Sequence, residues 1–430
     1  MSLIERIADL LRRLGADSIP LLFLIVAFRD LPLAFLGWLV ASPAGAYWFT
    51  RFDRIAVALL LFVLLYRSTP SKLRLRGRVF ECCYGAFCLV AGLNLLFLSQ
   101  LRQYAFRTWF SGLVLPFGVY LLARELVNEQ VWWQRARVAL LCLALLVGGS
   151  ALVEEFAGWD ILARPQGLRP VYPGSEWLRV NGPYGYAESL GLISAMLFFL
   201  LLSGAREKSL SRKAHALHVL ACVLLAAACI FSFFRVCWLA LAAGLILWIW
   251  FTGSVWLRRA VVVAALLLLL ALGLSYPWLR QSTFFQERVA NPTNVYHRIA
   301  TYRAGWKLVA ERPWSGVGFL NFPQAIQRQE LVRFRSGHAT DHPHNTYLQF
   351  AAELGLGAAV LYLVAMLALL FSALRLSRRL SDRKRAMSLV LPLLIYLGVN
   401  ATLSLATDMH INQLFFFVAG VIVSLEKRPR

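Results

Sequence analysis

The chain has 430 residues, of which 59% are hydrophobic and only 15% are charged, and its mean hydropathy is +0.63. This composition excludes an ordinary soluble globule and predicts an all-α polytopic membrane protein. The net charge of +22 does not indicate nucleic-acid binding, because much of it lies in short clusters between apolar segments.

Apolar segments that approach the length of a bilayer span follow one another along the chain. We place about twelve transmembrane helices, near residues 18–40, 54–67, 79–99, 104–124, 137–156, 185–204, 215–232, 236–252, 259–276, 345–373, 386–404 and 411–425. Residues 1–17 are polar and amphipathic, which is not the pattern of a cleavable signal peptide. All seven cysteines fall within apolar segments, and we interpret them as packing residues.

The basic loops predict an orientation, because short loops rich in Lys and Arg stay in the cytoplasm. With twelve spans, all such loops fall on one side: 67–78, 124–137, 206–213, 258–259 and 375–385. Both termini are then cytoplasmic, and residues 1–430 form a single integral membrane domain.

Two loops are predicted on the outer, periplasmic side, at 157–184 and 277–344. The second is long enough to escape the charge rule, so its many basic residues do not contradict the orientation. We expect it to be partly helical, with "TYRAGWKLVAERP" (301–313) as an amphipathic helix and "GVGF" (316–319) as a turn. Long ordered loops are often functional.

The stretch "DHPHN" (341–345) lies where the span predicted at 345–373 begins. Pro343 suits the first turn of a helix, so we expect His344 and Asn345 in that turn, facing the outer aqueous space. A neutral imidazole there could accept a proton from a hydroxyl. Helix capping and an interfacial position would explain the same residues.

Three arginines belong to the same predicted outer face: Arg179 and Arg235 at the ends of spans, and Arg298 in the long loop. Taken singly, Arg179 and Arg235 could snorkel or pair with a carboxylate, the candidates being Glu154, Glu155 and Asp408, and Arg298 could be a simple surface charge. Their convergence with His344 from separate parts of the chain instead suits a di- or polyanion, which guanidinium groups bind through a planar fork of donors. The outer loops contain no Asp-x-Asp pair, so we predict no metal or cofactor, and the arginines would neutralise a leaving diphosphate.

These residues lie in segments that resemble the O-antigen ligase and polymerase superfamily. The stretch "HPHNTYLQFAAELGLGAAVLYL" (342–363) is similar to its signature through His344, Asn345, Leu348, Glu353, Gly355 and Gly357, although Ala358 stands where a second small residue is usual. Weaker similarity lies in "RVNGPYGYAESLGL" (179–192), "FSFFRVCWLALAAG" (231–244) and "HRIATYRAGWKLVAERPWSGVGFLNF" (297–322). The resemblance covers about residues 170–370, and the N-terminal part is similar only in hydropathy.

The resemblance implies a GT-C type glycosyltransferase of the bacterial inner membrane with a periplasmic active site. The implied donor is an undecaprenyl-diphosphate-linked glycan, and in the ligase branch the acceptor is a sugar hydroxyl of lipid A-core, in lipopolysaccharide biosynthesis. The implied reaction is inverting and needs neither metal nor cofactor.

The resemblance also implies roles for the residues. The catalytic candidates are His344, which orients or deprotonates the acceptor, and Arg298 and Arg235, which hold the diphosphate. The substrate-binding candidates are Arg179, Asn345, His342 and Arg303.

Two other functions are also compatible with the sequence. A polymerase of O-antigen or exopolysaccharide, or a protein O-oligosaccharyltransferase, belongs to the same superfamily and differs in its acceptor. A lipid or solute transporter would explain the spans, but transporters usually place their binding groups near the membrane midplane rather than at one outer face.

Overall fold

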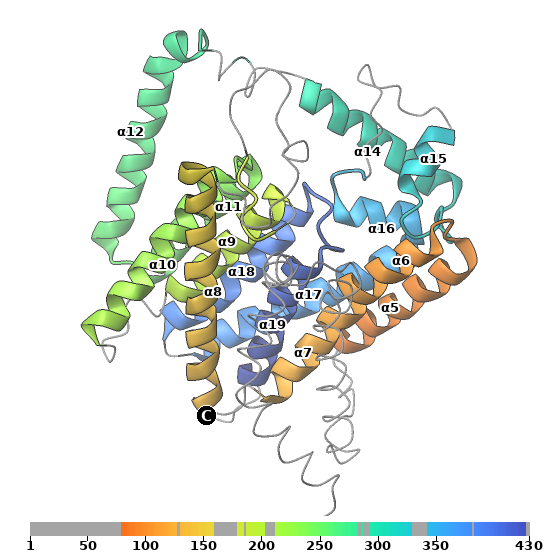
Figure 1. Ribbon diagram of the computed structural model, residues 1–430, viewed down its shortest axis with the longest axis horizontal. Coiled ribbons are helices and arrows are strands. Elements are labelled where there is room, and N and C mark those ends of the chain that lie inside the picture. Colours follow the sequence, from red (N-terminus) through yellow and green to blue (C-terminus); the bar gives the residue numbers. More distant parts are fainter. Residues whose placement is uncertain are drawn as a thin grey trace, which may run out of the picture.

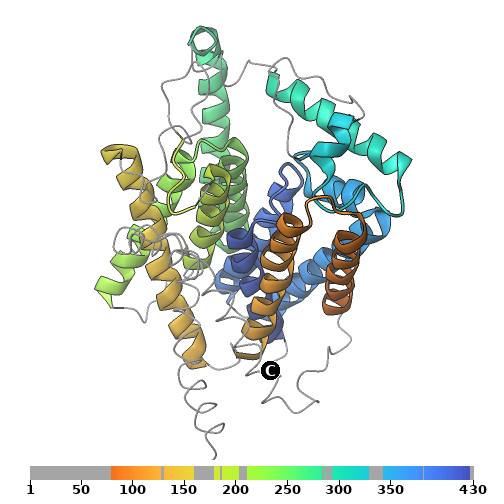
Figure 2. The same cartoon turned by 45° about the vertical axis from the view of Figure 1, so that its right-hand side comes forward.

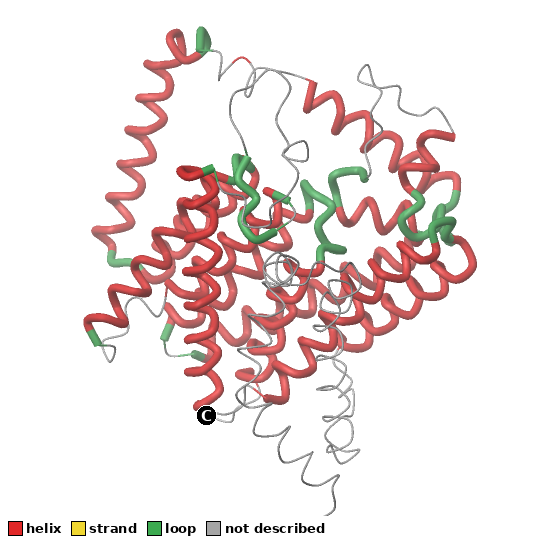
Figure 3. Tube along the Cα trace, viewed as in Figure 1, coloured by secondary structure: helices red, strands yellow, loops and turns green. Residues whose placement is uncertain are grey.

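The computed structural model describes residues 79–126, 130–158, 179–184, 186–202, 211–282, 286, 293–328, 342–380 and 382–426. The spans predicted at 18–40 and 54–67 lie outside this part of the chain. The described residues are helical or in loops, and none of them is in a strand (Figure 3). The all-α prediction is therefore confirmed for them.

Most of the helices form one bundle, shown in Figure 1. The first half of the described chain contains α5 (Val79–Leu98), α6 (Arg102–Trp109), a π-helical turn (Phe110–Val114), α7 (Leu115–Leu126), α8 (Gln130–Ala157), α9 (Ala187–Leu202), α10 (Arg212–Phe231), α11 (Arg235–Thr252) and α12 (Val255–Leu279), which stands apart from the bundle in Figure 1. The second half contains α14 (Thr293–Glu311), α15 (Phe322–Arg328), α16 (Thr346–Leu354), α17 (Leu356–Arg379), α18 (Arg383–Asn400) and α19 (Met409–Glu426).

Seven helical stretches among the described residues are long and apolar enough to cross a membrane. They are Val79–Leu98, Arg102–Arg124, Arg137–Ala157, Arg212–Phe231, Arg235–Thr252, Leu356–Arg379 and Met409–Glu426. α9 is apolar but has only 16 residues. The segments predicted at 259–276 and 386–404 are helical as α12 and α18, but they are not among the seven. The predicted count of about twelve is therefore not confirmed.

The single span predicted at 345–373 is wrong, because two helices occupy it. α16 ends at Leu354, Gly355 follows with φ of +88°, and α17 begins at Leu356. A Cβ at Gly355 would lie 2.2 Å from the carbonyl oxygen of Trp314, so the break needs glycine. The stretch that can cross a membrane is Leu356–Arg379, and α16 lies before it.

α19 lies at the centre of the bundle, with 89% of its span buried. It packs closely against α7, where Gly420 approaches the backbone of Tyr120: a Cβ at Gly420 would lie 2.6 Å from that carbonyl oxygen. Aromatic rings fill the contact between α5 and α17, with Phe87 and Tyr362 5.2 Å apart between centroids. This rigid centre fixes the positions of the loops at the helix ends.

α14, α15 and α16 form a separate layer at one end of the bundle, the upper right in Figure 2. They share a small hydrophobic core that includes Leu308, Phe322 and Leu348. The helix predicted within the long loop is confirmed by α14, and the predicted turn at 316–319 is confirmed as well. This layer, which we name the cap (α14–α16), contains Arg298 and adjoins His344.

Candidate functional site

Asn345 fixes the start of α16. Its Oδ1 accepts the backbone N–H of Leu348 at 2.9 Å, its Nδ2 donates to the carbonyl of Ala401 at 3.0 Å, and its own N–H donates to Ser404 Oγ at 3.1 Å. Asn345 is therefore the N-cap, and the helix begins at Thr346. The expectation that His344 and Asn345 belong to the first turn is wrong, because the side chain of Asn345, not Pro343, sets the helix start.

His344 lies just before this cap in a left-handed backbone conformation, with φ of +52°. Such a conformation is uncommon for residues other than glycine and persists where neighbouring contacts hold it. Here the hydroxyl of Tyr302 on α14 donates to the carbonyl of His344 at 3.3 Å. The rings of His342 and His344 lie 4.7 Å apart between centroids, and both side chains are partly exposed.

α14 brings Arg298 to the same region. Arg298 precedes Tyr302 by four residues and therefore lies on the same face of the helix, one turn away. The Arg298 side chain is partly exposed, whereas that of Arg303 is exposed. The hydrogen bond of Tyr302 thus ties the helix that carries Arg298 to the backbone of His344.

Arg179 and Arg235 form a second pair of neighbours. The guanidinium carbon of Arg179 lies 5.7 Å from the ring centroid of Phe234, and the N–H of Val180 donates to the carbonyl of Phe231 at 3.3 Å. These contacts hold Arg179 against the tight α10–α11 turn. Arg235 is the first residue of α11 and is exposed, as expected for a residue that follows this turn.

A carboxylate that the sequence did not single out pairs with Arg179. Glu188 Oε1 lies 3.5 Å from Arg179 Nη1, at the start of α9. Glu154, one of the expected partners, instead accepts the backbone N–H groups of Asn181 and Gly182, the latter at 2.7 Å. Two carboxylates therefore hold the segment that contains Arg179. Glu188 pairs with the Arg179 side chain, and Glu154 accepts hydrogen bonds from the backbone of the residues that follow.

The loop between α18 and α19 contacts both the segment that contains Arg179 and the segment that contains His344. Asp408 accepts the hydroxyl of Ser189 at 2.6 Å and caps α19 by accepting the N–H groups of His410 and Ile411. Ser189 follows Glu188, the partner of Arg179. The same loop contacts the start of α16, next to His344, because the N–H of Thr346 donates to the carbonyl of Leu403 at 3.1 Å. Figure 3 draws these loops in green on one side of the bundle.

Tyr184 lines the same region from the segment that follows Arg179. Its ring lies 5.4 Å from that of His410, and its side chain is fully buried. Burial, together with the nearby Asp408 carboxylate, raises the pKa of Tyr184 well above its ordinary value, so the hydroxyl stays protonated. Tyr184 is therefore a neutral packing residue and not a candidate base.

Residues 220–363 match the family model described as O-antigen ligase. The chain carries an O-antigen ligase domain. The match runs from α10 into α17 and includes Arg235, Arg298, His344 and Asn345, whereas Arg179 precedes it. The resemblance to this superfamily is therefore confirmed. A comparison with curated proteins finds no match.

The O-antigen ligase domain also contains an anchor that explains part of its signature. Glu353 is fully buried at the end of α16, where it accepts the backbone N–H groups of Leu320 and Phe322 and the side-chain amide of Gln349. Its carbonyl accepts the N–H of Gly318 at 2.9 Å. Glu353 thus attaches the turn at 312–321 to α16. Desolvation by burial raises its pKa to about 7, although these hydrogen bonds oppose the shift.

Within the described part of the chain, no group of three His, Cys, Asp or Glu side chains is arranged to hold a metal ion. The described side chains that a ligand could contact are mainly cationic. They are the exposed Arg235 and the partly exposed Arg298, with the imidazole of His344 beside the cap.

Proposed function

We propose that this protein is an O-antigen ligase. It transfers a glycan from undecaprenyl diphosphate to a sugar hydroxyl of lipid A-core, with inversion and without a metal. The observation that supports the proposal most is the match of residues 220–363 to the O-antigen ligase family, a region that includes Arg235, Arg298 and His344. Members of this family are membrane glycosyltransferase-like enzymes, which favours this function over transport.

In this proposal the diphosphate binds to Arg235 and Arg298. Guanidinium groups bind phosphate oxygens through paired donors and keep their charge at every physiological pH. As the bond between the anomeric carbon and the diphosphate breaks, negative charge grows on the leaving oxygen. Fixed arginines stabilise that charge more in the transition state than in the ground state, which accelerates the reaction. Arg179 is paired with Glu188, and its role is to hold the turn before Arg235.

His344 receives the acceptor. The acceptor oxygen forms a bond to the anomeric carbon from the face opposite the diphosphate, while the imidazole of His344 orients the acceptor hydroxyl and takes its proton. The bonds of Asn345 and Tyr302 hold the backbone of His344 from both sides. The ring of His342 lies against that of His344, and Arg303 is next to Tyr302, which contacts His344. In this proposal both residues contact the sugars.

The acceptor is assigned to lipid A-core because of the charge of the cap. Arg303, Lys307 and Arg312 are exposed on or just after α14, and phosphate groups on an acceptor would be attracted to them. A polymerase or a protein O-oligosaccharyltransferase would use the same domain with another acceptor. In all three cases the site faces the periplasm of a bacterial inner membrane, and both termini are cytoplasmic.

The test uses the purified protein, a synthetic undecaprenyl-diphosphate glycan, a chelator, and lipid A-core either added or withheld. We expect transfer only when lipid A-core is present, and its loss by at least about a hundredfold in His344→Ala. The matched control is His215→Ala, because His215 is exposed in the first turn of α10 and should not affect transfer. Elongation of the donor alone would identify a polymerase. A folded protein without any transfer would contradict a glycolipid acceptor.

A further inference from the structure

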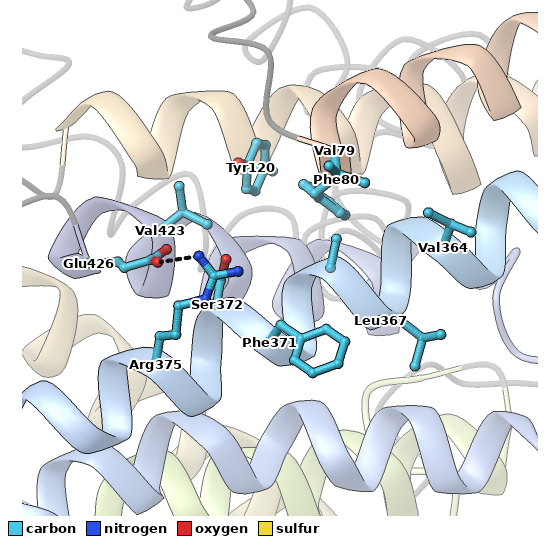
Figure 4. A pocket seen from close by; sticks show the side chains of 11 residues that line it. Val79, Phe80, Tyr120, Val364, Leu367, Phe371, Ser372, Arg375, Val423 and Glu426 are labelled. Atoms are coloured by element: carbon cyan, nitrogen blue, oxygen red, sulfur yellow. Dashed lines mark ion pairs between the residues drawn. The ribbon is translucent and has the colours of Figure 1, made fainter.

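A groove lies far from the candidate active site, between α5, α7, α17 and α19. Its volume is about 650 Å³, within the range of small-molecule sites. Val364, Leu367 and Phe371 form one apolar wall along α17, and Phe80 and Tyr120 face them (Figure 4). Phe371 is 59% exposed, so the wall is not closed by the described residues.

One end of the groove is polar and basic. Ser372, Arg375 and Glu426 line it together, as Figure 4 shows. Arg375 Nη1 lies 3.9 Å from Glu426 Oε1, which is a long ion pair, and the Arg375 side chain is 65% exposed. Such a pair is weak and leaves further guanidinium donors for another anion.

Arg379 adds positive charge beside this end, and further basic residues follow along the chain. Arg378 and Arg379 occupy the last turn of α17, and Arg379 Nη1 donates to the carbonyl of Glu426 at 3.0 Å. Arg383, Lys384 and Arg385 begin α18, where Asp382 serves as the N-cap. At the mouth of the groove, Arg375 and Arg379 therefore lie beside a single carboxylate, that of Glu426, which leaves net positive charge for an anion.

The groove lies at the opposite end of the bundle from His344. α17 begins at the cap and reaches Arg375 near its far end, roughly 30 Å away at about 1.5 Å per residue. The described C-terminal residues lie at this lower end in Figure 1. A lipid of the adjacent leaflet would present its phosphate at the depth of Arg375, while its acyl chain would follow the apolar wall.

We propose that this groove binds an anionic glycerophospholipid from the membrane leaflet opposite the candidate active site, with the phosphate on Arg375 and Ser372. Basic pockets between membrane helices are a recurring means of holding anionic headgroups. The glycan donor is a less suitable occupant, because its diphosphate must reach the other end of the bundle. The proposal does not depend on the transferase activity.

The test is native mass spectrometry of the full chain in detergent, titrated with phosphatidylglycerol, phosphatidylcholine or undecaprenyl phosphate. We expect phosphatidylglycerol to bind most tightly, and Arg375→Gln to weaken it about fivefold. Arg378→Gln is the matched control, since Arg378 is exposed on the same turn but does not line the groove.

Glu426→Gln separates lipid binding from a structural role of the ion pair. Both Arg375→Gln and Glu426→Gln remove the pair, so a structural role predicts the same effect in both variants. Lipid binding predicts opposite effects, because loss of the carboxylate favours an anionic headgroup at Arg375. Equal binding of phosphatidylcholine, tighter binding of undecaprenyl phosphate, or equal weakening in Arg378→Gln would overturn the proposal.

Discussion

Asn345 combines two roles in one side chain, since its oxygen caps α16 and its amide donates to Ala401. Asn345→Ala removes both, and we expect it to destabilise the protein by about 1–2 kcal/mol. Transfer activity should fall roughly tenfold or more, because the neighbouring His344 loses its support. Asn345→Asp keeps the capping oxygen but cannot donate to Ala401.

The two variants should therefore separate in a thermal unfolding assay combined with transfer kinetics. Asn345→Asp should retain most of the stability and lose part of kcat. If Asn345→Ala transferred glycan at the rate of the unmodified protein, the cap would not position His344.

Glu353 predicts a dependence of stability on pH. Its pKa is raised to about 7 in the folded protein, against an ordinary value near 4.5. The folded state therefore binds a proton more tightly than the unfolded state. The resulting stabilisation is fully present below about pH 4.5 and is lost as the pH rises through about 7. The loss is at most about 3–4 kcal/mol.

Glu353→Gln keeps an oxygen for the N–H groups of Leu320 and Phe322 but does not titrate. We expect its Tm to change less between pH 5 and pH 8 than that of the unmodified protein, measured in the same detergent, and to be higher at pH 8. Equal slopes in the two proteins would show that Glu353 does not titrate in this range.

At the scale of elements, the two glycines of the signature have different tasks. Gly355 adopts φ of +88° and ψ of 164°, a region that is almost restricted to glycine, and a Cβ there would meet the carbonyl of Trp314. Gly357 lies within α17 and has open space around it. We expect Gly355→Ala to destabilise the α16–α17 break by about 1–3 kcal/mol and to reduce transfer.

Gly357→Ala is the matched control for this prediction. It should leave transfer unchanged and stabilise α17 by up to about 1 kcal/mol. Unfolding curves and transfer rates of both variants check the difference. Similar behaviour of the two variants would mean that the break at Gly355 does not position the cap.

The spans could be predicted from the sequence because apolar length is a local property. The segments predicted at 79–99 and 411–425 agree with α5 and α19 within one or two residues. The break at Gly355 could not be predicted in the same way, because apolar residues continue on both sides of it. What enforces the break is the approach of Trp314, a tertiary contact.

The candidate site shows the same division. Arg179, Arg235 and His344 could be selected from the sequence because they lie beside apolar segments, and Arg298 because it lies in a segment that resembles the superfamily. Their supports could not, because they join distant parts of the chain: Ser189 and Asp408 are 219 residues apart. Asp408 was predicted as a possible partner of an arginine, whereas it accepts the hydroxyl of Ser189 on α9 and caps α19.

At the scale of the whole molecule, the two ends of the bundle differ in chemistry. The cap and the loops with Arg179 and His344 lie at one end, and the basic residues around Arg375 lie at the other. Basic residues next to membrane spans favour the cytoplasmic side. The proposed function therefore requires that the cap face the periplasm.

This orientation can be tested by cysteine labelling in a variant whose seven cysteines are replaced by alanine. Trp314 in the turn of the cap is 81% exposed, and Arg383 at the start of α18 is also exposed. We expect Trp314→Cys to react with a membrane-impermeant maleimide in intact spheroplasts, and Arg383→Cys to react only after lysis. Both should react in detergent, which controls for accessibility. The reverse pattern would place the cap in the cytoplasm and exclude a periplasmic transferase, because the acceptor would then lie across the membrane from His344.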